Sequence, residues 1–195
     1  VKDKRITAEA CAHHLVFDES DYEGKGALIK CNPAVKARTD RDALINAVKS
    51  DLIDVVATDH APHTWDEKQQ SYFKAPAGLP LVQHALLVLL DYYHSGVFSL
   101  ELITQKTSHN VAELYQIRDR GYIREGYWAD LVLVDLERPT VVGPEKLYYK
   151  CQWSPFQGHT FKSSIWATIV NGKLAYIDGK VQSSAGSGVP LTYNR

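Results

Sequence analysis

Apolar residues in the first part of the chain alternate between continuous runs and helical spacing, which predicts strands and helices in turn. Residues 6–11 form one short run, and residues 51–58 form another that is apolar on both faces from Ile53 to Ala57 apart from Asp54. Such two-sided runs are typical of parallel strands covered by helices. Between them, residues 39–48 combine a helix-opening capping pattern with apolar positions at helical spacing.

The pattern continues with a polar stretch and further helices. Residues 63–79 contain polar and turn-forming residues and predict a loop of unusual length, which favours a functional role. Residues 81–94 are apolar nearly all round and predict a core helix, and residues 100–106 and 111–115 predict shorter ones. Strands and helices in this order indicate an α/β fold.

The pattern changes after about residue 121, where short strands follow one another. The dipeptides Asn171-Gly172 and Asp178-Gly179 separate apolar runs and are strong signals for hairpin turns. We therefore expect three regions: an α/β part over residues 1–121, a small β-rich domain over 122–182, and a tail over 183–195.

One strand ends in chemically useful side chains. The stretch 55–63 reads VVATDHAPH, so an apolar run stops at Asp59 and His60, with His63 shortly after. Pro62 disfavours a helix here, so we expect Asp59 and His63 to point into one pocket from a loop. An aspartate at this place can ligate a cation and move a proton. The alternative is an aspartate that caps the next helix, with histidines as surface polar groups.

Composition restricts the classes of partner. The chain has 195 residues, 45% of them hydrophobic and 23% charged, with a net charge of −1. A near-neutral chain without a basic stripe or a long apolar run argues against nucleic acid and against a membrane. The three cysteines, Cys11, Cys31 and Cys151, are widely spaced and are expected to be free thiols in a reducing cytoplasm.

The start of the chain also carries information. It begins with Val1 and contains no methionine. We therefore expect an internal or C-terminal piece of a longer protein, or a processed chain.

Several segments together resemble the dihydroorotases of the amidohydrolase superfamily. ATDHAPHTWDEK resembles the family's eighth-strand signature and ITAEACAHHL its seventh-strand segment, in the family's order along the chain. The remaining similar segments are IKCNPAVKARTDRDAL, FKAPAGLPLVQHALL, YWADLVLVDL, CQWSPFQGHTFKSSI and VNGKLAYIDGKV. The resemblance implies the C-terminal part of a (β/α)8 barrel, about strands 7 and 8, followed by a small all-β extension.

The resemblance also implies a function and roles for individual residues. The family hydrolyses the cyclic amide of dihydroorotate to N-carbamoyl-aspartate, reversibly, in pyrimidine biosynthesis. Asp59 would be a ligand of the catalytic zinc and would carry a proton from the attacking water to the leaving ring nitrogen. His63 and Asn32 would bind the carboxylate of the substrate. The backbone of Ala77 and Gly78 would hold the pyrimidine edge.

Three further histidines are assigned supporting positions. His60 is expected to support the site rather than to ligate. His13 and His14 are expected on a strand, where neighbouring side chains point to opposite faces, so both can hardly hold one ion. We therefore expect all three to lie in the second shell or to serve packing.

The expected cofactor is one or two zinc ions, with most ligands outside this chain. The family's HxH pair is absent, and a complete barrel takes about 250 residues. Since zinc takes about four ligands, we expect the chain to be inactive and to bind zinc weakly without the N-terminal half of the barrel. Association into a homo-oligomer is also expected.

Two alternatives stay open. The chain could be a non-catalytic dihydroorotase-like structural subunit, although Asp59, His63 and Asn32 together argue against this. It could instead belong to a related ring amidohydrolase that acts on hydantoin or allantoin.

Overall fold

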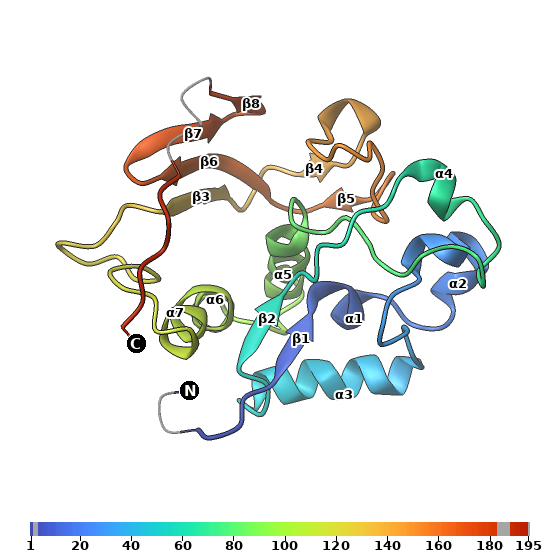
Figure 1. The fold of residues 1–195 in the computed structure, drawn as a ribbon, viewed down its shortest axis with the longest axis horizontal. Coiled ribbons are helices and arrows are strands. Elements are labelled where there is room, and N and C mark those ends of the chain that lie inside the picture. Colours follow the sequence, from blue (N-terminus) through green and yellow to red (C-terminus); the bar gives the residue numbers. More distant parts are fainter. Residues whose placement is uncertain (2–3, 183–187, 195) are drawn as a thin grey trace. The chain divides into compact units, whose positions relative to one another are not determined.

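The computed structural model describes residues 1, 4–182 and 188–194 (Figure 1). The chain divides into two compact units that interleave along the sequence. Unit 1 contains Val1–Thr7, Leu90–Thr140 and Lys162–Arg195, and unit 2 contains Ala8–Leu89 and Val141–Phe161. The contiguous boundaries expected at residues 121 and 182 stay a prediction, and residues 183–187 and 195 of the expected tail lie outside the described residues.

Unit 2 is built around a pair of parallel strands. β1 (Glu9–Cys11) pairs with β2 (Val55–Ala57), with Glu9 opposite Val55 and Cys11 opposite Ala57. The parallel pairing expected from the apolar runs is confirmed, although both strands are shorter than the runs. At the amino ends of the strands, the buried carboxylate of Asp54 accepts a hydrogen bond of 2.9 Å from the Ala8 N–H. This bond gives Asp54, the one polar residue between Ile53 and Ala57, a structural partner.

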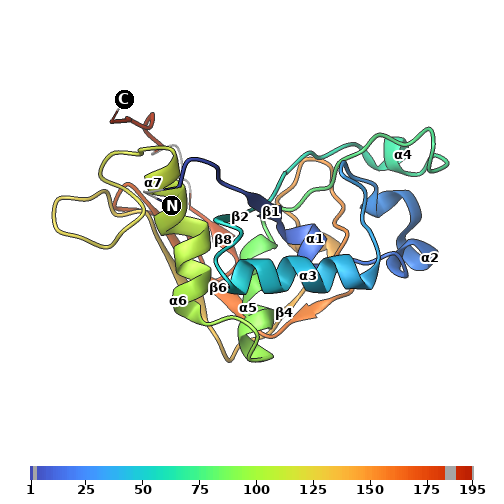
Figure 2. The ribbon, with the colours of Figure 1, turned by 90° about the horizontal axis from the view of Figure 1, so that it is seen from below.

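Helices α1 (Ala12–Val16), α2 (Asp21–Lys25) and α3 (Arg38–Lys49) lie between β1 and β2 in the sequence, and α4 (Trp65–Lys68) follows β2. Helix α1 follows β1 directly, and the longer α3 packs against α1 (Figure 2). The loop expected at 63–79 contains one turn of helix, α4, whose first turn is closed by a reciprocal capping box between Thr64 and Glu67. The helices here are α1 (Ala12–Val16), α2 (Asp21–Lys25), a 3-10 turn (Gly26–Ile29), α3 (Arg38–Lys49) and α4 (Trp65–Lys68).

The chain continues with a helix, and later with a small sheet of two strands. The helix expected over 81–94 is present as α5 (Ala85–His94). A two-stranded sheet joins β4 (Thr140–Val141) to β5 (Thr160–Phe161), with a 3-10 turn, Pro144–Lys146, between them in sequence. In unit 2, the apolar side chains that are almost fully buried include Leu15, Ile29, Leu79, Leu81, Trp153 and Phe161.

Unit 1 contains a four-stranded antiparallel sheet in the order β3-β6-β7-β8, which Figure 1 shows side by side. The strands are β3 (Leu131–Asp135), β6 (Ser164–Val170), β7 (Lys173–Ile177) and β8 (Lys180–Val181). Both expected hairpins are confirmed: Asn171 and Gly172 have φ of 50° and 79°, and Asp178 and Gly179 have φ of 45° and 82°. Two successive positive φ values are what a type I′ turn requires.

The helical part of unit 1 is more continuous than expected. Helix α6 (Leu100–Thr104), a π-helical turn (Gln105–His109) and α7 (Asn110–Leu114) follow one another without a break. The described end of the tail is held by backbone bonds, since Arg118 donates to Thr192 and Asn194 donates to Gln116. In the portion of the chain that the structure describes, no helix combines the length and the apolar character needed to cross a membrane.

Candidate functional site

All the residues of the candidate site belong to unit 2, where two parallel strands end side by side. Asp59 lies two residues beyond β2, and its backbone has a φ of 46°. Aspartate is among the few residues that adopt this left-handed conformation readily. The turn leaves the Asp59 residue exposed at the carboxyl end of the strand. A carboxylate in this place is available to a ligand.

His63 lies on the loop after Asp59, as expected, and is held by the backbone. Its Nε2 lies 3.0 Å from the carbonyl oxygen of Ala77. Because a carbonyl only accepts, Nε2 carries the proton, and Nδ1 lies 3.9 Å from the carboxylate of Glu67. The hydrogen bonds from Thr64 hold the pKa of Glu67 below its usual value. The His63 ring therefore lies beside a carboxylate whose charged form is favoured.

Gly78 occupies a position that only glycine can fill without a collision. A Cβ here would lie 2.4 Å from the Ala61 carbonyl oxygen, and the φ of 139° is also unfavourable for other residues. The Gly78 N–H donates to the Lys30 carbonyl at 2.8 Å. Its carbonyl accepts from the Lys68 ammonium at 2.9 Å. A substrate contact at the Gly78 backbone would have to share or replace one of these bonds, and the expected role stays a prediction.

Lys68 organises this loop, and the sequence alone did not single it out. Its side chain is buried, and its ammonium donates to the carbonyls of Lys30, Pro76 and Gly78. Burial lowers the pKa of Lys68 to about 8. The only available signal was a lysine in an otherwise loop-like stretch, and that pattern is common on surfaces. Its three acceptors come from two separate segments, which the sequence does not place together.

Trp153 also holds the loop, from a distant part of the chain. Its indole N–H donates a 2.7 Å hydrogen bond to the His63 carbonyl. Its ring lies below the Lys68 ammonium, with 5.8 Å between the nitrogen and the ring centroid. In the sequence, Trp153 lies in the segment CQWSPFQGHTFKSSI, which resembles the family but does not connect Trp153 to His63.

His60 has a structural partner, which fits a supporting position. Its Nδ1 accepts a hydrogen bond of 2.9 Å from the Leu81 N–H. Its ring lies 5.3 Å from that of Tyr149, and burial lowers the pKa of His60. Asn32 is exposed and precedes a cis peptide bond to Pro33. The roles expected for these two residues stay predictions.

His13 and His14 do not lie on a strand, and the expectation that their side chains diverge is wrong. β1 ends at Cys11, and both histidines lie in the first turn of α1. Their ring centroids are 4.1 Å apart. Within the described residues, the donor atoms of Cys11, His13 and His14 all lie within 4.8 Å of one another. The change from strand to helix between Cys11 and Ala12 brings the thiol of Cys11 close to the two imidazole rings.

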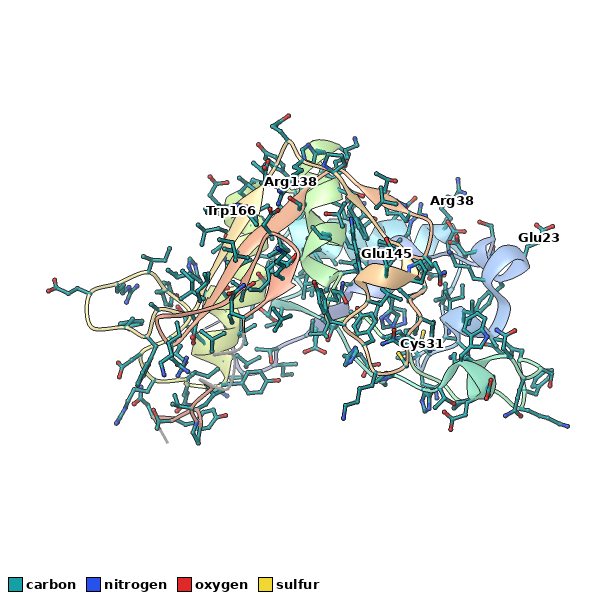
Figure 3. All side chains as sticks on the ribbon, turned by 90° about the horizontal axis from the view of Figure 1, so that it is seen from above. Glu23, Cys31, Arg38, Arg138, Glu145 and Trp166 are labelled. Carbon is teal, nitrogen blue, oxygen red and sulfur yellow. The ribbon has the colours of Figure 1, made fainter. Side chains whose placement is uncertain are left out.

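Cys31 completes the neighbourhood of these histidines. Its buried sulfur donates to the Pro33 carbonyl at 3.2 Å and lies 3.6 Å from Nε2 of His14. Figure 3 shows Cys31 in the interior of unit 2, with Arg38 at its edge. The three cysteines are free, as expected, although only Cys31 is fully buried.

Comparison with known proteins gives a consistent family. The chain matches the Amidohydrolase family over residues 2–175. It is 39% identical over 153 residues to the dihydroorotase of Halobacterium salinarum, covering 78% of this chain and 36% of that protein. It is 37% identical over 174 residues to the dihydroorotase of Clostridium acetobutylicum, and this match covers 89% of this chain and 41% of that protein. The chain thus spans about two fifths of the length of these relatives.

Solved structures show the same fold. The L-hydantoinase (dihydropyrimidinase) of Arthrobacter aurescens matches with a TM-score of 0.91 and 25% identity, over 95% of this chain and 42% of that one. The dihydropyrimidinase of Brevibacillus agri matches with a TM-score of 0.86 and 24% identity, over 93% of this chain and 41% of that one.

Proposed function

Because this chain belongs to the amidohydrolase family, we propose that it is the C-terminal part of a zinc-dependent dihydroorotase. The complete enzyme would hydrolyse the cyclic amide of dihydroorotate reversibly to N-carbamoyl-aspartate. The observation that carries the proposal is the exposed Asp59 at the carboxyl end of a parallel strand pair, with His63 on the loop that follows. The curated dihydroorotases at 39% and 37% identity support this substrate over others.

Asp59 fits a shared metal site in type and in place. Carboxylate oxygen is an accepted zinc ligand, and catalytic zinc has about three protein ligands and an open position. Within the described residues, Asp59 does not belong to a group of three or more donors. The remaining ligands would therefore come from the N-terminal half of the barrel, of which this chain would supply about strands 7 and 8. Zinc, when bound, polarises a carbonyl and lowers the pKa of a coordinated water to about 7.

The residues of this chain have three roles in the proposed reaction: proton transfer, substrate binding and support of the loop. The Asp59 carboxylate accepts a proton from the attacking water and returns it to the leaving ring nitrogen, which general acid–base catalysis requires in both directions. His63 and Asn32 bind the substrate carboxylate, and a protonated His63 would offset its charge. The backbone of Ala77 and Gly78 holds the pyrimidine edge. Lys68 and Trp153 keep this loop in place through the bonds described above.

A second candidate function is that of a hydantoinase. The solved structures that match include an L-hydantoinase, with a TM-score of 0.91. This candidate shares Asp59 but not the role of His63 and Asn32, since hydantoin carries no ring carboxylate. A non-catalytic structural subunit is disfavoured because it needs neither the exposed Asp59 nor the His63 loop.

The experiment that tests the proposal is complementation. The chain is co-expressed with the corresponding N-terminal part of the C. acetobutylicum dihydroorotase, and assembly is checked by size-exclusion chromatography. The assembled, zinc-loaded complex is offered dihydroorotate, hydantoin and allantoin, with each half alone as a control. We expect turnover of dihydroorotate only, by the complex only. Turnover of hydantoin alone would favour the second candidate, and an assembled but inactive complex would contradict both.

A further inference from the structure

The group formed by Cys11, His13 and His14 does not include Asp59, although Cys11 pairs with Ala57 and lies within electrostatic range of the Asp59 carboxylate. Cys11 is the last residue of β1 and the residue before α1, and the two histidines lie in the first turn of that helix. Their donor atoms lie within 4.8 Å of one another. Tetrahedral zinc bonds of about 2.3 Å to sulfur and 2.0 Å to nitrogen place ligand atoms roughly 3.5 Å apart. Small side-chain adjustments would bring the three donors to that spacing.

His13 is the observation that points to a ligand. It is completely buried, and neither ring nitrogen makes a well-formed hydrogen bond in the described structure, although the Thr58 backbone lies near enough to interact weakly with the ring. Burial and the neighbouring His14 lower the pKa of His13 to about 3, against a smaller opposing effect of the Thr58 backbone. The ring is therefore neutral and keeps one nitrogen lone pair. Buried polar atoms nearly always have a partner, and an ion is one explanation when no group of the protein serves.

The tautomer of His14 is set by a hydrogen bond to the backbone. Its Nε2 lies 2.8 Å from the Pro33 carbonyl oxygen, which only accepts, so Nε2 carries the proton in the neutral ring. The lone pair then belongs to Nδ1. Histidines that bind metals usually donate their other N–H to a carbonyl in this way, which fixes the ring and its tautomer.

Cys11 supplies the sulfur. Burial, with Glu9, Asp59 and Cys31 as further causes, raises the pKa of its thiol to about 11, so the thiol is protonated without a cation. A bound metal ion removes such a proton and neutralises the charge that the surroundings disfavour. Cys31, by contrast, faces the protonated Nε2 of His14 and the Pro33 carbonyl, so it supports the ring.

We propose that Cys11, His13 and His14 bind one borderline or soft divalent cation, such as Zn²⁺, through one sulfur and two imidazole nitrogens. Water would take the fourth position. This site goes beyond the proposed catalytic function and does not use Asp59. It also replaces the expectation that the chain alone binds zinc weakly, which placed His13 and His14 on opposite faces of a strand.

The test uses Co²⁺ and Zn²⁺ alone with the full 195-residue chain. We expect one Co²⁺ per chain, with a thiolate-to-cobalt charge-transfer band and the intense visible bands of tetrahedral Co²⁺, all displaced by Zn²⁺. Cys11→Ser should abolish the charge-transfer band, and His14→Ala should weaken binding at least tenfold. Asp59→Asn should keep the charge-transfer band and the stoichiometry of one Co²⁺ per chain, although the loss of a nearby negative charge changes the affinity. Circular dichroism checks that each variant is folded.

A second measurement needs no variant. Zn²⁺ should slow alkylation of Cys11 at least tenfold, measured by peptide mass spectrometry. Cys151, which is also half-buried and lies outside the group, is the internal control. Equal alkylation of Cys11 with and without Zn²⁺, or a wild-type Co²⁺ spectrum without a sulfur band, would overturn the site. Loss of the ion in Asp59→Asn would assign it to the catalytic site instead. None of these outcomes depends on whether the complemented enzyme is active.

Discussion

The indole N–H of Trp153 donates a hydrogen bond to the backbone carbonyl of His63, across 90 positions of sequence. Trp153 is 1% exposed and its bond to the half-buried His63 is partly buried, so the loss of this partner is costly. The loop that carries the candidate substrate-binding histidine therefore depends on a residue from the second segment of unit 2. Stability and substrate binding should be coupled through this contact.

Trp153→Phe should lower the free energy of unfolding by about 1–3 kcal/mol, because the His63 carbonyl loses its donor and some packing volume is lost. Urea denaturation measures the change. Trp166→Phe is the control, since Trp166 is 44% exposed, and it should change stability by less than about 0.5 kcal/mol. Equal effects of the two substitutions would contradict the role of the hydrogen bond.

Gly78→Ala should destabilise the protein by about 2 kcal/mol or more, through backbone strain and the collision with the Ala61 carbonyl. Gly158→Ala is a matched control, because Gly158 also has a positive φ, of 83°, but a Cβ there meets nothing within 4 Å. The difference between the two urea midpoints, at equal slope, reports the collision together with the different backbone strain at a φ of 139°. If the two variants unfold at the same urea concentration, the close approach of Gly78 to Ala61 does not hold in solution.

Stability should fall when the pH drops from about 6.5 towards 4. His84 is buried against Tyr149 and Phe161, and burial lowers its pKa to about 4 from 6.5. Between these values the unfolded chain binds the additional proton, so acid favours unfolding by up to about 1.4 kcal/mol per pH unit. His13, whose pKa is lowered to about 3, acts in the same direction.

His84→Gln tests this pH dependence, because glutamine cannot titrate and keeps hydrogen-bonding groups near Tyr149 and Ser154. The variant should show a shallower loss of unfolding free energy between pH 6.5 and 4, with His13 accounting for the rest. Urea titrations at several pH values measure both slopes. An unchanged slope would mean that His84 is not buried in its neutral form.

Asp59→Asn, in the complemented enzyme of the proposed function, should lower kcat by about 100-fold or more, since the amide cannot carry the proton. Asparagine has nearly the same shape, so substrate binding should remain measurable by calorimetry. Near-normal turnover would remove Asp59 from the mechanism, while leaving the assembly of the two halves intact.

His63→Ala should mainly raise KM for dihydroorotate, by about 10- to 100-fold, because a hydrogen bond to a charged group contributes about 1.5–3 kcal/mol. His63→Gln is the matched control: it can still donate to the Ala77 carbonyl, but it cannot become a cation. A KM close to that of the unsubstituted enzyme in both variants would refute the carboxylate-binding role. Recovery in His63→Gln alone would show that His63 acts by positioning the loop.

The sequence by itself determined the features that depend on neighbouring residues. The two hairpin turns form where Asn-Gly and Asp-Gly occur, because the required positive φ values are a property of those residues. The parallel pairing of β1 and β2 followed from apolar runs that need cover on both faces. Asp59 at the end of β2 followed from the abrupt change from apolar to polar residues.

Only the tertiary structure decided which groups meet. Lys68 is buried because carbonyls from two segments converge on its ammonium, and Trp153 reaches His63 from a distant segment. The sequence ended the first run at residue 11, but apolar periodicity did not show that a helix begins at the next residue. That boundary turns His13 and His14 from opposite faces of a strand to one turn of a helix beside Cys11. Local chemistry set the turns, and long-range packing set the sites.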